Sequence, residues 1–362
     1  MSPLGIGVIG AGTISDTYLE NLTRFPDVRV VHVADLDVER AATQAAKHGV
    51  PTSGSVTGLL DDPAVDLVVN LTIPAAHVSV GLAAVEAGKH VWSEKPLALD
   101  RQSARKLLDS AAARGLRVAC APDTVLGPGL QTARRAVEAG RIGKPLMALA
   151  LFQSPGPESW HPSPEFLFQD GGGPLLDMGP YYLTTLVQLL GPVRRVTGAG
   201  GRARDVRIIG SGPRAGTSFP VTVLTSVSAL VEFVDGGSAQ VVFSFDSAVR
   251  RNGFVELTGT SGAAVLPDPN TFDGSTVLHL ADGEEELAAV GHSATRGTGA
   301  LELVRAIRAG VPERASGELA YHVLDVMLSI EESIVAGRSV EVESTVDVPP
   351  PLPSDWDPYT AG

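Results

Sequence analysis

Leu4-Gly5-Ile6-Gly7-Val8-Ile9-Gly10-Ala11-Gly12-Thr13-Ile14-Ser15 is the stretch that decides the fold of this 362-residue chain. Its apolar first half predicts a buried strand. Its glycine-rich second half predicts a tight turn that leads into a helix. Gly10 permits the turn, Gly12 lets a pyrophosphate approach the backbone, and Ser15 is small enough for close packing of helix on strand. The free N–H groups at a helix start face phosphates, so the stretch predicts a dinucleotide site that includes Gly10, Gly12, Thr13 and Ile14.

A second predicted strand, Arg29–Ala34, ends at Asp35, at the distance from the glycine turn that this type of site requires. A carboxylate there accepts hydrogen bonds from an adenosine ribose and repels a 2′-phosphate. No arginine follows directly, so the sequence favours NAD as the cofactor, with NADP as the alternative. The other interpretation is that Asp35 and Asp37 cap the helix that begins near Val38.

Strands and helices continue to alternate up to residue 122. The expected strands are Val65–Leu71, His90–Trp92 and Leu116–Ala121, separated by helices at Glu39–His48, His77–Ala87 and Arg101–Arg114. Such alternation predicts a Rossmann-type, doubly wound parallel sheet in residues 1–122, with ligands bound beyond the carboxyl ends of the strands. Four candidate cofactor residues fall at such ends: Thr72, Pro74, Glu94 and Lys95. His77 opens the next helix, either as a cofactor-site residue or as an ordinary polar residue of a first turn.

Lys95 stands in the segment Trp92-Ser93-Glu94-Lys95-Pro96. One interpretation is a solvated surface lysine. However, Lys95 follows an apolar strand and precedes a proline, which restricts the local backbone. A desolvated ammonium at this place stabilises an alkoxide or shifts its own pKa. We therefore expect Lys95 to lie where a nicotinamide ring meets an alcohol or ketone.

Residues 123–345 have a different character and are expected to form a second, α+β domain. A helix at Leu130–Ala139 and a strand at Pro145–Gln153 precede a long loop over residues 154–174 and a helix that ends near Leu190. Short strands then follow one another, which predicts a large, open, mainly antiparallel sheet. They are expected at Val193–Ala199, Val221–Val234, Ser238–Ser247, Phe254–Gly259, Ala263–Leu266 and Thr276–Leu280. Helices at Gly299–Ala309 and Ser316–Ala336 close the domain, and residues 346–362 are expected to be an extended tail.

Composition excludes several classes of function. The formal net charge is -13 and there is no dense run of Lys or Arg, which argues against nucleic acid and anionic membranes as partners. The single cysteine excludes an intrachain disulfide. No apolar run reaches the ~20 residues of a membrane helix, and no secretory signal is present, so a cytoplasmic protein is expected. No pair of ligands has zinc or iron spacing, so no metal is expected.

Four motifs in this order resemble the glucose–fructose oxidoreductase / inositol dehydrogenase / rhizopine-catabolism (Gfo/Idh/MocA) family. They are Gly10-x-Gly12, Asn70-Leu71-Thr72-Ile73-Pro74-x-x-His77, Ala87-Gly88-Lys89-His90-Val91 and Glu94-Lys95-Pro96. The resemblance implies an NAD(P)-dependent oxidoreductase that acts on a secondary alcohol or ketone of a sugar, inositol or related polyol. It also implies a homodimer or homotetramer formed through the C-terminal sheet.

Gly171-Gly172-Gly173-Pro174-Leu175-Leu176-Asp177-Met178-Gly179-Pro180-Tyr181-Tyr182 carries the second part of the resemblance. The family's usual form is a glycine run followed by Asp-x-Gly-x-His, and here Tyr181 replaces the histidine. The tyrosine resembles the dihydrodiol dehydrogenase branch and glucose–fructose oxidoreductase, where a tyrosine hydroxyl is the acid/base. With an unperturbed pKa of ~10, that phenol needs the help of a neighbouring ammonium. The other interpretation is that Tyr181 and Tyr182 simply pack at a helix start.

The resemblance gives each candidate residue a role. Lys95 binds the reacting oxygen, Tyr181 exchanges the proton, and Asp177 orients substrate hydroxyls. Asp123, Trp160 and His161 are candidates for the rim of the substrate pocket, and His161 is the alternative acid/base. A second class of function also stays open, because a dinucleotide-binding chain without the usual histidine can be a non-catalytic sensor or regulator.

Overall fold

The computed structural model describes residues 2–362 and divides them into two compact units. The first unit runs to Pro128 and also includes Val290–Tyr321 and Pro349–Gly362, while the second consists of Gly129–Ala289 and His322–Val348. The expected boundary at residue 122 therefore falls inside the first unit, and two later segments of the chain return to that unit.

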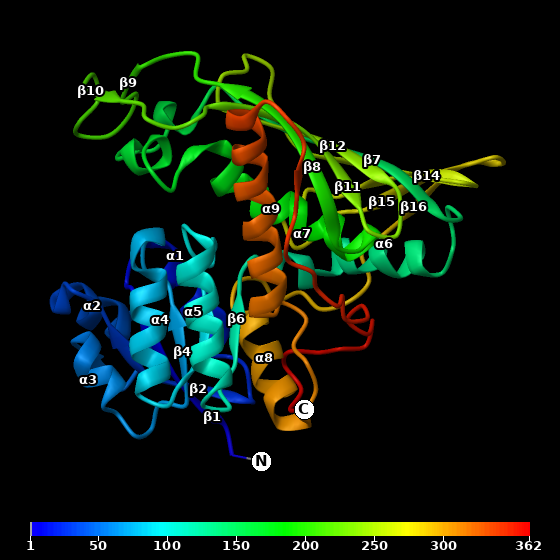
Figure 1. The fold of residues 1–362 in the computed structure, drawn as a ribbon. Coiled ribbons are helices and arrows are strands. Elements are labelled where there is room, and N and C mark those ends of the chain that lie inside the picture. The colour runs from blue at the N-terminus through cyan, green and yellow to red at the C-terminus, as the bar shows by residue number, and fades with distance from the viewer. Residues whose placement is uncertain (1) are drawn as a thin grey trace. The chain divides into compact units, whose positions relative to one another are not determined.

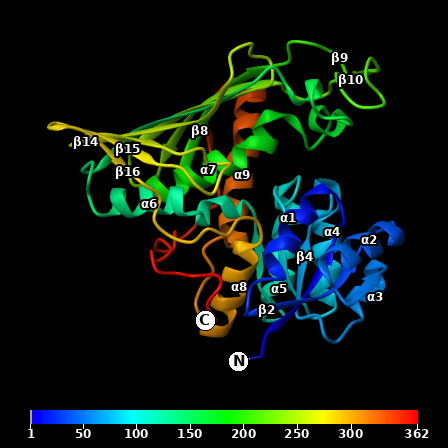
Figure 2. The same cartoon turned by 180° about the vertical axis from the view of Figure 1, so that it is seen from behind.

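The first unit is built on a parallel sheet, which has six strands within the described residues (Figures 1 and 2). Its order is β3-β2-β1-β4-β5-β6. The strands are β1 (Leu4–Ile9), β2 (Val28–Ala34), β3 (Thr52–Gly54), β4 (Leu67–Asn70), β5 (His90–Ser93) and β6 (Val118–Cys120). Strands β1, β4 and β5 are almost wholly buried, as expected for parallel strands covered on both faces. The Rossmann architecture predicted from the sequence is confirmed.

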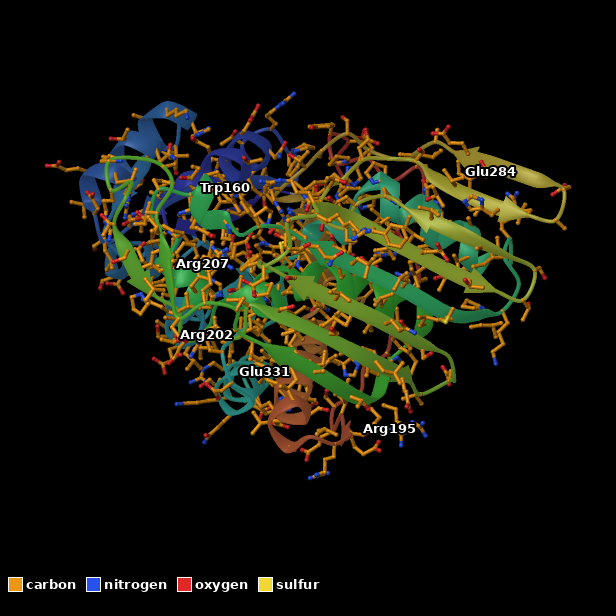
Figure 3. The ribbon with its side chains drawn as sticks, turned by 90° about the horizontal axis from the view of Figure 1, so that it is seen from above. Trp160, Arg195, Arg202, Arg207, Glu284 and Glu331 are labelled. Carbon is orange, nitrogen blue, oxygen red and sulfur yellow. The ribbon has the colours of Figure 1, made fainter. Side chains whose placement is uncertain are left out.

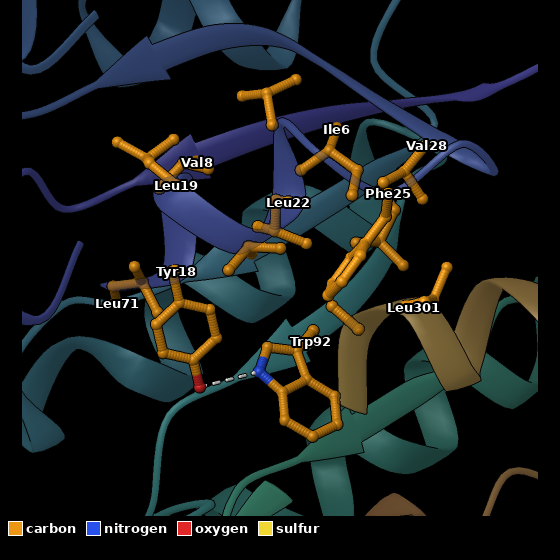
Figure 4. Packing of buried hydrophobic residues seen from close by; sticks show 14 of the residues in the cluster. Ile6, Val8, Tyr18, Leu19, Leu22, Phe25, Val28, Leu71, Trp92 and Leu301 are labelled. Atoms are coloured by element: carbon orange, nitrogen blue, oxygen red, sulfur yellow. Dashed lines mark hydrogen bonds between the residues drawn. The ribbon is translucent and has the colours of Figure 1, made fainter. Parts of the chain in front are cut away.

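Helices connect the strands of the first unit, and one helix of this unit was expected in the second domain. They are α1 (Thr13–Leu22), α2 (Val38–His48), α3 (Val56–Leu60), α4 (His77–Glu86), α5 (Arg101–Ala112) and α8 (Thr298–Ala309), with short 3-10 turns η1 (Pro74–Ala76) and η2 (Asp123–Leu126). Helix α4 packs against α5, and α8 contacts α1, β5 and β6. Helix α8 had been expected in the second domain, but it supplies Leu301, Leu303 and Val304 to the core of the first unit (Figure 4).

The C-terminal residues also pack on the first unit, although they contain no helix or strand. Leu352 is buried, and Trp356 packs against the core cluster. The guanidinium of Arg305 lies over the Trp356 ring at 4.7 Å. The expected extended tail is thus irregular in structure but anchored by an aromatic side chain.

The second unit contains an open sheet with nine strands among the described residues. Its order is β16-β15-β14-β13-β7-β12-β11-β8-β17. The β7–β12 pair is parallel, and the other pairs are antiparallel. The strands are β7 (Pro145–Gln153), β8 (Val193–Gly201), β11 (Ser226–Phe233), β12 (Ser238–Ser244), β13 (Arg251–Gly259), β14 (Gly262–Leu266), β15 (Thr276–Leu280), β16 (Gly283–Leu287) and β17 (Val340–Glu341). The predicted mainly antiparallel sheet is confirmed.

One face of this sheet is covered by helices. Helix α7 (Gly173–Leu190) contacts β7, β11 and β12, and α9 (Gly317–Ala336) packs on β8, where Gly198 meets the backbone of Ile330. Buried and more exposed residues alternate along β11 and β12, so the other face lacks such a cover within the described chain. Helix α6 (Pro128–Glu138) completes the unit.

The stretch read as a long loop has structure of its own. It contains two short 3-10 turns, η3 (Pro157–Ser159) and η4 (Glu165–Phe168), and its last two residues already belong to α7, which begins at Gly173. Two further strands, β9 (Val206–Ile208) and β10 (Ser218–Pro220), form a separate hairpin. None of the helices in residues 2–362 is long and apolar enough to cross a membrane.

Candidate functional site

The glycine turn between β1 and α1 leaves open space over the start of the helix. Gly10 has φ +105°, and a Cβ there would lie 2.6 Å from the carbonyl oxygen of Leu71, so only glycine fits. A Cβ at Gly12 would meet no atom of the described residues within 4 Å. The buried Ser15 donates to the Gly12 carbonyl from its N–H at 3.0 Å and from Oγ at 2.7 Å. Thr13 and Ile14 open α1, and no side chain caps this end of the helix, so their backbone N–H groups suit an anion.

Asp35 ties this turn to the end of β2. Its Oδ2 accepts the Ala11 N–H at 2.7 Å, and its Oδ1 accepts the Asp37 N–H at 2.9 Å. Oδ1 also lies 2.6 Å from the guanidinium of Arg40. Burial opposes ionisation, but Arg40 and the two backbone N–H groups outweigh it and hold the pKa of Asp35 below its usual value.

Of the two acids that follow β2, only Asp37 caps the next helix. Asp37 is the N-cap of α2 and accepts the Arg40 N–H at 3.1 Å, whereas Asp35 does not cap the helix but binds the glycine turn. Although no arginine follows Asp35 directly, Arg40 lies five residues further on, in the first turn of α2.

His77 joins the loops that follow β4 and β5. Its Nδ1 lies 2.7 Å from the carbonyl oxygen of Pro96, and its Nε2 lies 2.9 Å from that of Thr72. Asn70 supports the same corner, because its Nδ2 donates to the His77 carbonyl at 3.0 Å and its Oδ1 accepts from the Thr72 hydroxyl at 2.7 Å. Burial lowers the pKa of His77, against the pull of the two carbonyls. His77 is therefore a buried bridge and not simply a polar first-turn residue.

Lys95 is half-buried and sits in a turn that is held on both sides. Its backbone N–H donates to Glu94 Oε2 at 3.1 Å. The carbonyl oxygen of the next residue, Pro96, contacts Nδ1 of His77. The other Glu94 oxygen, Oε1, accepts the hydroxyl of Tyr18 at 2.8 Å. Trp92 in turn donates its Nε1–H to the Tyr18 oxygen at 3.2 Å (Figure 4).

Asp123 lies fully buried beneath the same part of the first unit. Its Oδ1 is 3.1 Å from the guanidinium of Arg296, and its Oδ2 accepts the Gly297 N–H at 2.8 Å, at the start of α8. Burial raises the pKa of Asp123 despite the arginine. This position differs from the pocket rim expected from the sequence, because a carboxylate enclosed by its own chain is not presented to a substrate. Asp123 instead fastens α8 to the first unit.

Asp177 and Tyr181 lie on α7 in the second unit, four residues apart. That spacing puts both side chains on one face of the helix, one turn from each other. Asp177 is half-buried and Tyr181 is buried in the middle of the helix, not at its start. Tyr182 is a core residue, as its neighbours Phe152 and Phe243 show, and its Oη accepts the Gly253 N–H at 2.8 Å. Burial raises the pKa of Tyr182.

Trp160 and His161 lie on the loop between β7 and α7. Trp160 is 64% exposed and Phe166 is 50% exposed, and the His161 ring makes edge contacts with both at 5.5 Å and 5.4 Å between centroids. His161 Nδ1 accepts the Ser163 N–H at 3.0 Å, so the neutral ring carries its proton on Nε2.

Arg207 holds this loop in place from β9 (Figure 3). Its side chain is buried, donates to the Pro155 and Phe245 carbonyls, and pairs with Glu158 and Asp246. The guanidinium also lies over the Phe168 ring at 4.8 Å. The exposed aromatic rings therefore stand on a firmly anchored segment.

Two models of one family match this chain. Residues 4–121 match an oxidoreductase family with an NAD-binding Rossmann fold, and residues 130–265 match the GFO/IDH/MocA C-terminal domain.

The chain belongs to the GFO/IDH/MocA oxidoreductase family.

Individual GFO/IDH/MocA relatives extend the likeness over almost the whole chain. The 1,5-anhydro-D-fructose reductase of Ensifer adhaerens is 28% identical over 358 residues, covering 93% of this chain and 98% of the relative. Inositol 2-dehydrogenase 3 of Saccharopolyspora erythraea is 35% identical over 159 residues, or 43% of this chain and 47% of the relative. The crystal structure of an NAD binding oxidoreductase from Klebsiella pneumoniae matches with a TM-score of 0.83 and 25% identity, covering 94% of this chain and 99% of that one.

Most of the sequence-predicted residues of this GFO/IDH/MocA protein fall into two groups, one in each unit. Gly10, Gly12 and Asp35 meet at the glycine turn, and Thr72, His77, Glu94 and Lys95 are joined at the ends of β4 and β5, with Pro74 opening η1 beside them. Asp177, Tyr181, Trp160 and His161 belong to the second unit. Sequence reasoning missed Tyr18, Arg40 and Arg296, and for Arg40 the signal was present as an arginine on the first turn of the helix after Asp35.

Among residues 2–362, no group of three or more His, Cys, Asp or Glu side chains is arranged to hold a metal ion. The residues that suit a dinucleotide are those of the first unit. No atom of the described residues fills the space beside Gly12, and Asp35 stands at the end of β2, which are the features that a dinucleotide site of this fold requires.

Proposed function

We propose that this protein is an NAD(P)-dependent dehydrogenase or reductase that transfers a hydride between the nicotinamide and a secondary alcohol or ketone carbon of a sugar, inositol or related polyol. The observation that carries the proposal is the construction of the first unit. There a glycine turn with open space at Gly12 and a lysine whose backbone is held on both sides are built on one parallel sheet. The membership of the oxidoreductase family, with sugar- and inositol-named relatives, supports the substrate class.

The proposed cofactor is NAD. Asp35 presents a carboxylate at the end of β2, and the negative charge disfavours a 2′-phosphate. NADP is the second choice, because Arg40 is about half-exposed and its cation suits a 2′-phosphate. In this structure, however, Arg40 is paired with the Asp35 carboxylate. When bound, the nicotinamide supplies the carbon that accepts or gives the hydride.

Lys95 is the proposed ligand of the reacting oxygen. Its ammonium donates a hydrogen bond to that oxygen and stabilises the alkoxide, whose negative charge appears when the hydroxyl proton leaves during oxidation or when hydride adds to the carbonyl carbon during reduction. The hydrogen bond that the Lys95 N–H donates to Glu94, and the contact of the Pro96 carbonyl with His77, fix the backbone around Lys95 before substrate arrives, so less ordering is required during the reaction.

Tyr181 is the proposed acid/base and Asp177 the residue that orients substrate hydroxyls. Their positions one turn apart on α7 let both address one polyol. His161 is the weaker candidate for the proton transfer. Its Nδ1, the basic nitrogen of this neutral tautomer, already accepts the Ser163 N–H, so the ring has to give up that hydrogen bond to act as a base.

The exposed rings of Trp160 and Phe166, with the Nε2–H of His161 between them, are the proposed sugar-contacting surface of the second unit. A sugar or cyclitol ring presents C–H groups and hydroxyls, which suit an aromatic face and a hydrogen-bond donor respectively. Arg207 keeps the segment ordered before binding, which reduces the entropic cost of binding.

The uncovered face of the second unit's sheet is the proposed contact between subunits. Met147, Leu149, Val242 and Leu230 lie on the outward side of adjacent strands β7, β12 and β11, by the alternation of each strand. An apolar patch of this kind marks a contact surface. Light scattering with size exclusion tests this proposal: Leu149→Glu together with Leu230→Glu should yield a monomer, and an unchanged mass would reject this face.

The direct test of the function is a panel of sugars, inositols and dihydrodiols mixed with the purified protein and either NAD or NADP. Appearance of reduced nicotinamide with a polyol, and a higher kcat/KM with NAD, are the expected results. Tight NAD binding without turnover on any member, or on the matching ketones with reduced cofactor, would instead identify a sensor or regulator.

A further inference from the structure

Tyr18 is a buried phenol on α1 whose hydroxyl has two partners. The side chain is fully buried among Leu19, Leu22 and Trp92, where an unpartnered hydroxyl would be costly (Figure 4). Phenylalanine would fill the same space but would leave the buried Trp92 Nε1–H without this acceptor and Glu94 Oε1 without this donor, so the hydroxyl serves two polar partners.

The direction of each bond follows from donor chemistry. The indole N–H of Trp92 donates only, so the Tyr18 oxygen is its acceptor at 3.2 Å. The Tyr18 proton is then directed to Glu94 Oε1 at 2.8 Å. Burial, and after it the charges of Asp123 and Glu94, raise the pKa of Tyr18, so the phenol stays a donor.

Glu94 passes this restraint on to the lysine turn. Its second oxygen, Oε2, accepts the backbone N–H of Lys95 at 3.1 Å. The hydrogen bond from Tyr18 to Oε1 restrains rotation of this carboxylate and thereby favours the contact of Oε2 with the Lys95 N–H. The chain of bonds thus runs from Trp92 through Tyr18 and Glu94 to Lys95.

Tyr18 also belongs to the helix that begins at the glycine turn. Ile14, in the first turn of α1, precedes Tyr18 by one helical turn. A single hydrogen bond therefore connects the helix whose N-terminus suits the cofactor phosphates with the turn that carries Lys95.

We propose that Tyr18 is a positioning residue for Lys95, which it holds in register with the dinucleotide-binding helix through the carboxylate of Glu94. The inference rests on the proposed function in so far as Lys95 binds the reacting oxygen. Its geometric part, the restraint of Lys95 by Tyr18, stands independently of the substrate.

The test is a double-mutant cycle of Tyr18→Phe and Lys95→Ala on kcat/KM and cofactor Kd. Tyr18→Phe should lower kcat by about tenfold to hundredfold, as expected for misplacement of a catalytic group, with the Kd for NAD changed by less than about threefold. In the Lys95→Ala background the same change should have almost no further effect, because the two residues act as one unit. Equal losses in both backgrounds would show that Tyr18 is only structural.

Tyr182→Phe is the matched control. It removes another buried phenol hydroxyl that has a backbone N–H partner, but in the second unit and without a bond to Glu94. A fall in kcat equal to that of Tyr18→Phe would attribute the effect to general loss of a buried hydroxyl and overturn the proposal.

A second measurement decides the matter if no substrate is turned over, which would reject the proposed function alone. The rate of Lys95 acetylation by limiting acetic anhydride at one fixed pH, read by mass spectrometry relative to that of Lys106, reports how firmly the Lys95 segment is held, without catalysis. This ratio should change in Tyr18→Phe, because the restraint on the segment is lost, and stay at the wild-type value in Tyr182→Phe. An unchanged ratio in Tyr18→Phe would overturn the positioning role whatever the activity.

Discussion

Asp35 and Arg40 form an ion pair at 2.6 Å at the end of β2, and the same carboxylate accepts the Ala11 N–H of the glycine turn. The Asp35 carboxylate thus binds the glycine turn and also neutralises the Arg40 guanidinium, which would otherwise suit a 2′-phosphate. Cofactor choice is expected to depend on the balance between these two charges.

Asp35→Asn should move this balance toward NADP. The amide keeps an acceptor oxygen for the turn but loses the charge that repels a phosphate and engages Arg40. We expect the ratio of kcat/KM for NADP to that for NAD to rise by about tenfold or more, since removal of one charge-assisted contact is worth about 1.4 kcal/mol or more. Asp35→Asn combined with Arg40→Ala should lose most of the gain. A ratio that does not move in the single variant would refute the assignment of Asp35.

Tyr181→Phe should leave substrate binding largely intact while it removes the proton-transferring hydroxyl. General acid–base groups contribute about 10²- to 10⁴-fold, so kcat should fall by about 10²-fold or more and lose its dependence on the phenol in the pH profile. His161→Gln serves as the comparison, because it retains a donor but cannot titrate, and it should cost less than about tenfold. The reverse order of losses would transfer the acid/base role to His161.

The parts of this site that the sequence predicts are formed by residues that are contiguous or regularly spaced in the chain. The strand, glycine turn and helix around Gly12, the acid at Asp35 and the segment Glu94-Lys95-Pro96 are contiguous or regularly spaced, and the structure places them at the ends of parallel strands. Strand β3, by contrast, is only three residues long, too short for an alternating pattern to show. Likewise, glycine and proline usually interrupt a helix, yet α7 runs through Gly179 and Pro180.

Residues that act through distant partners were not predictable in the same way. Tyr18 is 76 residues from Glu94, and Arg296 is 173 residues from Asp123, so neither spacing carries a signal. Helix α8 follows the strands of the second unit in sequence but belongs to the first unit. There Gly299 lies so close to the Trp92 ring that a Cβ at this position would clash with it. Only the fold shows that such a close approach exists.

The stability of the protein should fall in mildly acidic solution because of His322. This buried ring accepts the Val193 N–H at Nε2 and has Ser344 as its Nδ1 partner, and burial lowers its pKa from 6.5 to about 4. The unfolded chain takes up a proton near pH 6.5 while the folded protein does not. The stabilisation is therefore complete above that pH and declines as the pH falls toward 4, by about 3 kcal/mol at most.

Urea unfolding of wild type and His322→Gln at a series of pH values measures this contribution. The glutamine oxygen can accept the Val193 N–H but does not titrate, so the difference between the two proteins should shrink or reverse as the pH falls from 7 to 4. A constant difference across this range would show that His322 does not titrate on unfolding as described.

The most direct test of the account is the rate of hydride transfer in a single turnover of Lys95→Ala, measured by rapid mixing with a saturating polyol found in the substrate panel. Lys106→Ala, which removes an exposed lysine from α5, is the matched control. The account predicts a loss of about 10³-fold in the chemical step for Lys95→Ala, as for removal of a donor to a developing oxyanion, with the Kd for NAD nearly unchanged and Lys106→Ala like wild type. A Lys95→Ala rate within about threefold of wild type would contradict it.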